Sequence, residues 1–161
     1  MYKKGMVCYN LDVISVILFR RIEMAVINEI ITASADGRLS FGDYISDEKR
    51  KVSDFELDGN LYNVKTHKLV TRLEKNSILL IETVPGSTVH NLDVYEDITE
   101  FSIEGFEDTQ ITMELEGSTD YKIYVNNNQV GFTTSTKSGK LSFSAELEEK
   151  PKKVKIVKYT E

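Results

Sequence analysis

Apolar and polar residues alternate with a period of two through residues 121–159, and this alternation constrains the fold more than any other feature of the chain. Tyr121, Ile123 and Val125 share one face of an extended segment, whereas Lys122 lies on the opposite face. This pattern is typical of a β-strand with one buried and one solvated face. The stretch therefore predicts an antiparallel sheet.

Turn residues separate the strands of this stretch. Residues 126–129 predict a first reversal through a four-residue turn, and the Ser-Gly pair at residues 138–139 predicts a second. In the last strand, over residues 153–159, lysines alternate with Val154 and Ile156. We expect this strand to lie at an edge of the sheet, because lysines on an edge strand discourage pairing with unselected chains.

Glycine-containing turns also punctuate the chain before residue 120. The pairs Asp36-Gly37 and Asp58-Gly59 each predict a hairpin, because glycine tolerates the positive φ that tight hairpin turns require. The Val-Pro-Gly sequence at residues 84–86 suits a type II turn. The region is therefore expected to continue the series of hairpins.

The structure of three other segments is predicted from their content of apolar and β-branched residues. Residues 78–81 are continuously apolar, which predicts a strand near the centre of the fold with both faces covered. Residues 90–100 are expected to form a looser connection. Residues 25–33 have a spacing that fits one face of a helix, but their β-branched content favours a strand.

These patterns predict an all-β, antiparallel, sandwich-like fold built from consecutive hairpins. We expect one β domain over residues 24–161, and a division into two sub-units, residues 24–97 and 98–161, stays open. Residues 1–23 lack the β pattern that begins after Met24. We interpret them as an upstream extension that is translated from a wrongly assigned start site; the alternative is a genuine strand or helix docked loosely on the domain.

Charge and composition argue against several classes of binding partner and against a membrane-spanning segment. The formal net charge is −6, which argues against nucleic acid or an anionic membrane as the partner. The longest apolar run near the N-terminus, residues 13–19, is too short to span a bilayer, and its surroundings do not fit a signal peptide. We therefore expect the protein in the cytoplasm or in an assembled particle. Cys8 is the single cysteine, so no intramolecular disulfide can form.

The candidate catalytic residues do not form a recognisable constellation. His67 and His90 are the two histidines, and Ser87 and Asp93 lie close to His90 in the sequence. Closeness in sequence does not establish the geometry of a catalytic triad. We interpret both histidines as ordinary loop or strand residues and predict no catalytic residue.

Acidic residues in the predicted turns are candidates for a weak cation site. They are Asp36, Asp58, Glu107 and Asp108. Turn formation explains them more simply, because short acidic side chains stabilise turns by hydrogen bonding to the backbone. We predict no metal ligand, no cofactor and no cofactor-binding residue.

Several segments together resemble a group of small clostridial proteins that carry the label endosialidase. The segments include INEIITASADGRLSFGDY, KVSDFELDGNLYNVKTHK and TRLEKNSILLIETVPGSTVHNL, and the resemblance covers about residues 24–158. It implies hydrolysis of polysialic acid. Enzymes of that class hold the substrate carboxylate with clustered arginines, and from Met24 onward this chain has only Arg38, Arg50 and Arg72. No site residue is assigned through this resemblance.

The stretch of residues 121–159 separately resembles the immunoglobulin-like accessory modules of bacterial surface and phage proteins. The residues that carry this resemblance are Tyr121, Ile123, Tyr124, Val125, Asn126, Val130, Gly131, Gly139 and Phe143. It implies a β-sandwich with a binding or structural role.

Together these features favour a non-catalytic binding or assembly module, with a phage or surface structural component as the first choice. The expected partner is another protein or a second copy of the chain. The alternative is a small glycan-active enzyme, or an accessory domain of one, as the endosialidase label suggests. A concave pocket with converging polar groups would favour the enzyme, whereas a flat patch or an unpaired strand edge would favour assembly.

Overall fold

A computed structural model describes residues 29–161 of the chain. The proposed extension over residues 1–23, Cys8, and the first part of the predicted strand at residues 25–33 lie outside the described residues. Within residues 29–161 the regular structure consists of thirteen strands. In chain order they are β1 (Ile31–Ala33), β2 (Leu39–Phe41), β3 (Arg50–Leu57), β4 (Asn60–His67), β5 (Val70–Lys75), β6 (Ile78–Val84), β7 (Thr88–Val94), β8 (Ile98–Glu104), β9 (Thr109–Glu114), β10 (Asp120–Val125), β11 (Asn128–Thr134), β12 (Lys140–Ala145) and β13 (Lys152–Lys158).

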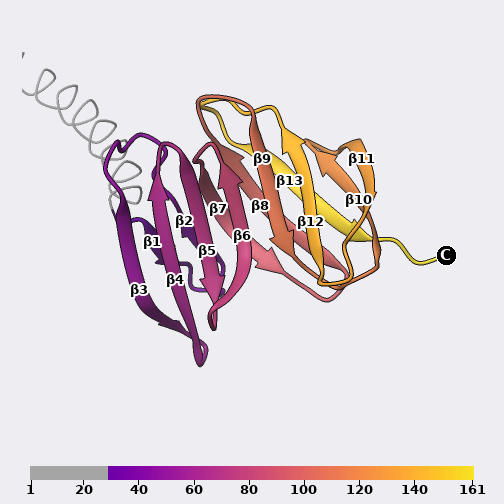
Figure 1. The fold of residues 1–161 in the computed structure, drawn as a ribbon, viewed down its shortest axis with the longest axis horizontal. Helices are drawn as coiled ribbons and strands as arrows, with labels where there is room; N and C mark the ends of the chain where they lie inside the picture. The colour runs from indigo at the N-terminus through magenta and orange to yellow at the C-terminus, as the bar shows by residue number, and fades with distance from the viewer. Residues whose placement is uncertain (1–28) are drawn as a thin grey trace, which may run out of the picture.

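The strands form two antiparallel sheets. Sheet A has seven strands in the order β1-β2-β7-β8-β13-β10-β11, and sheet B has six in the order β12-β9-β6-β5-β4-β3. Figure 1 shows sheet B in front of sheet A. The chain crosses between the sheets several times, for example from β6 to β7 and from β8 to β9. The predicted all-β, antiparallel sandwich is confirmed.

Alternate residues of both sheets fill the space between them. In β10, Tyr121 and Ile123 are buried, and in β13, Val154 and Ile156 are buried, as the alternation predicted. One hydrophobic cluster draws on both sheets; its most deeply buried members include Val64, Leu73, Ile81, Val89, Ile103, Ile111, Met113 and Val154. The sequence left open a division into two sub-units between residues 97 and 98. β6 pairs with β9 and β7 pairs with β8, so each sheet contains strands from both sides of that division.

Two of the hairpin turns follow the sequence signals closely. Asp58 and Gly59 both have positive φ, 50° and 76°, and they join β3 to β4 as a two-residue type I′ turn. Asn126 and Asn127 also have positive φ, 48° and 66°, and they join β10 to β11. The prediction of a four-residue turn at residues 126–129 was wrong, because Asn tolerates the left-handed conformation well enough to allow the tighter turn.

The predicted edge position of the last strand was wrong. β13 lies between β8 and β10, where Val154 pairs with Phe101 on one side and with Val125 on the other. Both backbone edges of β13 are therefore used within sheet A. Lys153 and Lys155 lie on the solvated face of β13, opposite in direction to Val154 and Ile156, and Lys155 Nζ lies 3.6 Å from Glu100 Oε1 on β8.

Two other segments differ from the sequence-based expectation. Residues 90–100 form most of the β7–β8 hairpin, and a register shift between His90 and Asp93 gives them their irregular pattern. Residues 78–81 do lie in a central strand, β6, but only one of its faces is covered. Ile78 is 59% exposed and Ile81 is fully buried, because Ile78 directly follows a tight turn at the end of the sandwich.

The Val-Pro-Gly segment at residues 84–86 does not form the predicted type II turn. It carries the chain from sheet B to sheet A, the Val84-Pro85 peptide bond is cis, and Gly86 does not have the positive φ that a type II turn requires. Glycine is needed here for another reason. A Cβ atom on Gly86 would lie 2.1 Å from the backbone oxygen of His67, so only glycine allows the two segments to approach this closely.

Candidate functional site

The residues around His90 do not converge into a catalytic arrangement. His90 Nε2 lies 3.3 Å from Glu104 Oε1 on the neighbouring strand. Asp93 instead pairs with Arg38, with Oδ2 to Nε at 3.1 Å. Ser87 is completely buried and takes part in a hydrogen-bond network between the sheets. Ser87 and Asp93 therefore make contacts that hold the fold, and neither orients His90.

His67 ends β4 and is buried. Burial lowers its pKa, and the nearby positive charges of Lys49, Lys65 and Lys68 lower it further. Protonation of His67 is thus opposed by desolvation and by like charges. The described residues supply no nucleophile or carboxylate partner for this neutral imidazole, which fits a structural role.

Asp36, one of the acidic turn residues, has side-chain partners in its own turn. Asp36 accepts a hydrogen bond from the Ser34 hydroxyl and lies 3.3 Å from Arg38 Nε. The Ser34 hydrogen bond is the main cause of the lowered pKa of Asp36. Asp58 occupies the β3–β4 turn, and Glu107 and Asp108 lie in the connection before β9. Among residues 29–161, no group of three or more His, Cys, Asp or Glu side chains could hold a metal ion.

A network of buried hydroxyl groups joins the sheets near His67. Thr71 Oγ1 donates to the backbone oxygen of Ser87 at 2.8 Å and lies 2.8 Å from Thr66 Oγ1. Thr66 Oγ1 accepts the backbone N–H of Asp43 at 2.8 Å, and Ser87 Oγ lies 2.7 Å from Thr83 Oγ1. No buried side-chain polar atom in the described residues lacks a partner. These hydroxyl groups are engaged in hydrogen bonds within the fold and are not available as catalytic groups.

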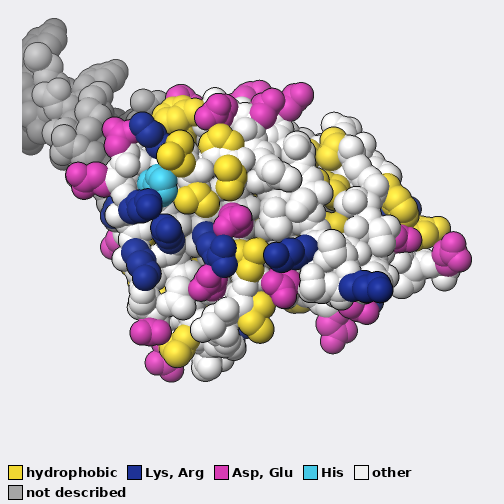
Figure 2. All heavy atoms as spheres, viewed as in Figure 1, with side chains coloured by type: hydrophobic (Ala, Val, Ile, Leu, Met, Phe, Trp, Pro, Cys, Tyr) yellow, Lys and Arg dark blue, Asp and Glu magenta, His cyan; other side chains and the backbone are white. Residues whose placement is uncertain are grey.

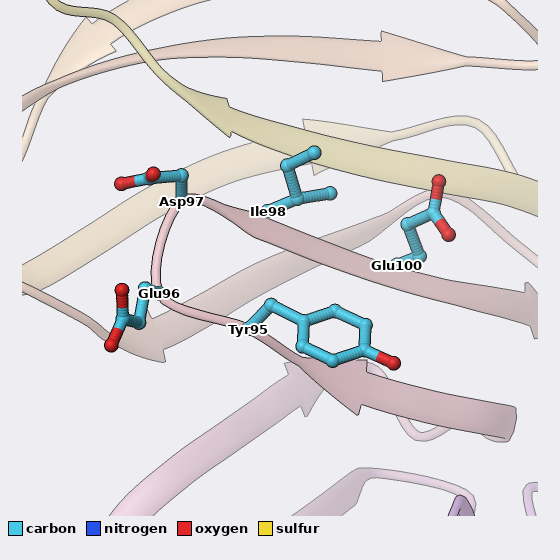
Figure 3. Close-up of a pocket in the computed structure, with 5 residues that line it drawn as sticks. All are labelled: Tyr95, Glu96, Asp97, Ile98 and Glu100. Carbon is cyan, nitrogen blue, oxygen red and sulfur yellow. The ribbon is translucent and has the colours of Figure 1, made fainter.

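The β7–β8 hairpin borders an open pocket of about 570 Å³ that is lined by Tyr95, Glu96, Asp97, Ile98 and Glu100. Figure 3 shows the Tyr95 ring directed along the hairpin away from the turn and the Glu100 carboxylate directed away from this ring, whereas the Glu96 and Asp97 carboxylates project from the turn. All five residues belong to one hairpin. An enzyme pocket gathers polar groups from several elements, so this pocket does not match that description. Its acidic lining also repels an anionic substrate such as polysialic acid.

Strand register brings basic residues together on the solvated face of sheet B. Lys51 of β3 lies opposite Lys65 of β4, which lies opposite Arg72 of β5. Arg72 pairs with Glu74 and Glu82 at 2.9 and 3.1 Å, whereas no ion pair is found for Lys51 or Lys65 within the described part of the chain. Figure 2 shows Lys and Arg side chains gathered over β3 to β6.

We call Lys51, Lys65 and Arg72 the basic row; with Asn63, Val64 and Glu74 they line a shallow pocket of about 270 Å³. This row is not apparent from the sequence, because its members lie far apart along the chain. One signal could have revealed it. Lys51 and Lys65 lie seven residues before Asp58 and six after Gly59, so a hairpin centred on that turn places them near each other.

Apolar side chains are exposed at the end of the sandwich where several loops meet. They are Ile45, Leu69, Val84 and Phe106. Figure 2 shows hydrophobic side chains grouped over the upper ends of β4 to β6. Phe106 packs edge-on against Tyr44, with ring centroids 4.8 Å apart. Burial is the main cause that raises the pKa of Tyr44 to about 12, so this phenol stays protonated at neutral pH.

β11 is an unpaired edge of sheet A, and its composition sets it apart from the other edges. Its seven residues, Asn128–Thr134, include no charged residue and no proline. Within the described residues the other edge strands are β1, which has three residues, β3, which has four charged residues and a bulge, and β12, which begins with Lys140. Natural edge strands are usually protected by charge, proline, bulges or short length. β11 has only a bulge, at Val130 between Gln129 and Gly131.

The outward face of β11 is apolar. Val130 and Phe132 are 57% and 52% exposed. Phe132 packs edge-on against Tyr159, with ring centroids 5.5 Å apart, and Lys122 Nζ lies 4.6 Å from the centre of the Tyr159 ring. We call the edge strand, with the exposed side chains of Val130, Phe132 and Tyr159, the β11 surface. Exposed apolar surfaces of this kind mark interaction sites.

Comparison with family models, curated proteins and solved structures gives no match for this chain. The two resemblances noted from the sequence stay predictions. Residues 29–161 contain no helix with the length and hydrophobicity needed to cross a bilayer.

Proposed function

We propose that this chain is a non-catalytic assembly module that associates with copies of itself through the β11 surface. The observation that carries the proposal is an exposed, uncharged edge strand with an apolar outward face. Unpaired backbone N–H and C=O groups on such an edge bind another strand by extending the sheet. A structural component of a phage particle or cell surface is the setting that this mode of association fits best.

The contacts of the chemically reactive side chains support the same proposal. His90, Ser87 and Asp93 each bond to a different partner, and the basic row and the acidic pocket beside Tyr95 lie on different sheets. Catalysis needs several groups that converge on one reacting atom. In the described residues these side chains instead make contacts between strands and between sheets.

The proposal predicts that wild-type protein forms a defined oligomer and that Phe132→Lys lowers its mass toward that of the monomer. A charged side chain on each copy brings like charges together at the contact, which opposes association. Light scattering during size-exclusion chromatography measures the mass at several concentrations. Ser144→Lys, on the exposed face of the edge strand β12, is the matched control and should leave the mass unchanged. Equal masses for wild type and Phe132→Lys would rule out association through β11.

A second candidate function, binding of an anionic glycan, is favoured by the basic row. Lys51 and Lys65 face each other without an ion-pair partner among the described residues, and like charges placed directly opposite are unfavourable. A carboxylate-bearing sugar polymer would relieve this repulsion. The acidic pocket beside Tyr95 lies on sheet A, so it supplies no catalytic carboxylate to the basic row.

We expect polysialic acid to be left intact by the wild-type protein, with no release of reducing ends. Any binding, measured by calorimetry at low salt, should weaken in Lys65→Gln and with added salt. Lys140→Gln on β12 is the matched control. Turnover by wild type that Arg72→Ala abolishes would instead establish the glycan-active enzyme and contradict the assembly module.

A further inference from the structure

We infer that a second copy of the chain docks on the apolar end of the sandwich around a twofold axis, with the acidic residues beside Phe106 of each copy facing the basic residues beside His67 of the other. The exposed side chains at this end are Ile45, Leu69, Val84 and Phe106, and we call them the loop-end surface. This surface is separate from the β11 surface, so the inference goes beyond the proposed function.

The loop-end surface is continuous, because backbone hydrogen bonds and a ring contact hold its loops together. The Lys68 N–H donates to the Ser46 oxygen and the Gly86 N–H donates to the Lys68 oxygen, both at 2.9 Å. These bonds tie the loop after β2, the β4–β5 turn and the β6–β7 connection to one another. Phe106, in the β8–β9 connection, packs on Tyr44 of the loop after β2. The four exposed apolar side chains therefore lie together, and patches of this kind mark interaction sites.

Basic residues lie on one side of the loop-end surface, around His67. After burial, the causes that lower the pKa of His67 are the positive charges of Lys49, Lys65 and Lys68, and no acidic residue opposes them. Lys49 and Lys65 have no ion-pair partner within the described residues. Glu48 offsets their charge only in part. This side is therefore positive overall, and we call it the basic flank.

Acidic residues lie on the other side, around Phe106. Glu107 and Asp108 follow Phe106 directly in the chain. Besides burial, the charge of Glu149 is among the causes that raise the pKa of Tyr44, which packs against Phe106. We call Glu107, Asp108 and Glu149 the acidic flank; in the described part of the chain none of them has an ion-pair partner. Figure 2 shows Asp and Glu side chains above the group of hydrophobic side chains and Lys and Arg side chains below it.

The two flanks together decide which partner fits the loop-end surface. A uniformly acidic partner is repelled by the acidic flank, and a uniformly basic partner is repelled by the basic flank. A fitting partner has an apolar centre and carries the two charges in the reverse order. A second copy turned by half a revolution meets this requirement, because a twofold contact uses the same surface on both copies and makes each opposite-charge contact twice. The contact then has the apolar core and polar rim of ordinary protein interfaces.

Two separate contact surfaces give the assembly module a way to grow beyond a dimer. Figure 1 shows β11 at the right of the molecule and the upper ends of β4 to β6, where the loop-end surface lies, toward the left. A copy that uses the β11 surface for one neighbour keeps the loop-end surface for another. This consequence rests on the proposed function, whereas the loop-end contact itself does not.

An exchange of charges tests the loop-end contact in a Phe132→Lys background, in which the β11 contact is disrupted. We expect this background to be a dimer in light scattering at low salt. Lys49→Glu with Lys65→Glu reverses the basic flank, and Glu107→Lys with Asp108→Lys reverses the acidic flank. Like charges then face each other in each variant, so each should be a monomer. An equimolar mixture should restore the dimer, because every flank in the mixed pair meets one of opposite charge.

Two further variants in the same background complete the design. Lys140→Glu, at the end of β12 away from the loop-end surface, is the matched control and should remain a dimer. Leu69→Lys places a charge at an exposed position in the apolar centre. It should be a monomer, and mixing it with either charge variant should not restore the dimer.

The outcomes separate this inference from the proposed function. Restoration of the dimer in the mixture of charge variants supports the twofold contact. Charge variants that remain dimers, or a mixture that stays monomeric, overturn it. A monomeric Phe132→Lys background also overturns it and leaves association through the β11 surface standing. Dimers of equal mass for wild type and Phe132→Lys overturn association through β11 and leave the loop-end contact standing.

Discussion

Replacing Gly86 with alanine is expected to prevent stable folding of the chain. The new Cβ atom would lie 2.1 Å from the backbone oxygen of His67 and 3.2 Å from the carbonyl carbons of His67 and Lys68. The two segments are also tied together, because the Gly86 N–H donates to the Lys68 oxygen at 2.9 Å. Backbone on both sides leaves no flexible side chain to move. We expect a loss of about 4 kcal/mol or more, which is a large fraction of the roughly 5 to 15 kcal/mol that stabilise a typical domain.

Gly131→Ala is the matched control for this prediction. Its Cβ atom would meet only the Ile123 side chain at 3.6 Å, so the variant should keep wild-type stability or gain about 0.4 to 1 kcal/mol from a less flexible unfolded chain. Urea unfolding followed by circular dichroism measures both variants. A Gly86→Ala midpoint equal to that of wild type would show that the β4–β5 turn and the β6–β7 connection can separate without cost.

Local sequence pattern was enough to predict which residues are buried. Ile111, Met113, Ile123 and Val154 lie on the inward faces where the alternation placed them. A strand has only two faces, so a period of two in hydrophobicity identifies the buried one wherever a single face is covered. Asp58-Gly59 likewise formed a tight hairpin, because the turn depends on backbone preferences of the turn residues themselves.

Strand order could not be predicted in the same way. The lysines of β13 suggested an edge strand, yet β13 lies between β8 and β10. A solvated lysine looks the same on the outer face of a central strand and on an edge strand. Which strands become neighbours depends on where the chain crosses from one sheet to the other, as it does at residues 84–86, and no local pattern marks these crossings.

The candidate surfaces depend on this long-range order, and that is why the sequence did not reveal them. The basic row exists because three strands align Lys51, Lys65 and Arg72 side by side. β11 becomes an interaction surface because sheet A ends there. In the sequence, residues 128–134 are an ordinary short strand, and only the unpaired edge gives their lack of charge a meaning.

A comparison of two isoleucines in β6 tests the packing of the central strand. Ile81→Ala should destabilise the protein by about 2 to 5 kcal/mol, because Ile81 is fully buried, pairs with Leu73 and Met113, and would leave a cavity that its neighbours only partly fill. Ile78→Ala should cost about 0.5 kcal/mol or less, because Ile78 is mostly exposed at the start of the strand. Urea midpoints measure the difference.

The difference in destabilisation between Ile81→Ala and Ile78→Ala shows whether residues 78–81 are covered on both faces or on one. If both faces of the segment were covered, as a continuous apolar run suggests, both substitutions would remove buried methyl groups and their costs would be similar. In the structure Ile81 is buried between the sheets, whereas Ile78 is exposed at the end of the strand beside the turn, so the costs should differ by several-fold. A similar loss from Ile78→Ala would mean that another surface covers Ile78 in solution. That result should depend on protein concentration if the surface belongs to a second copy of the chain.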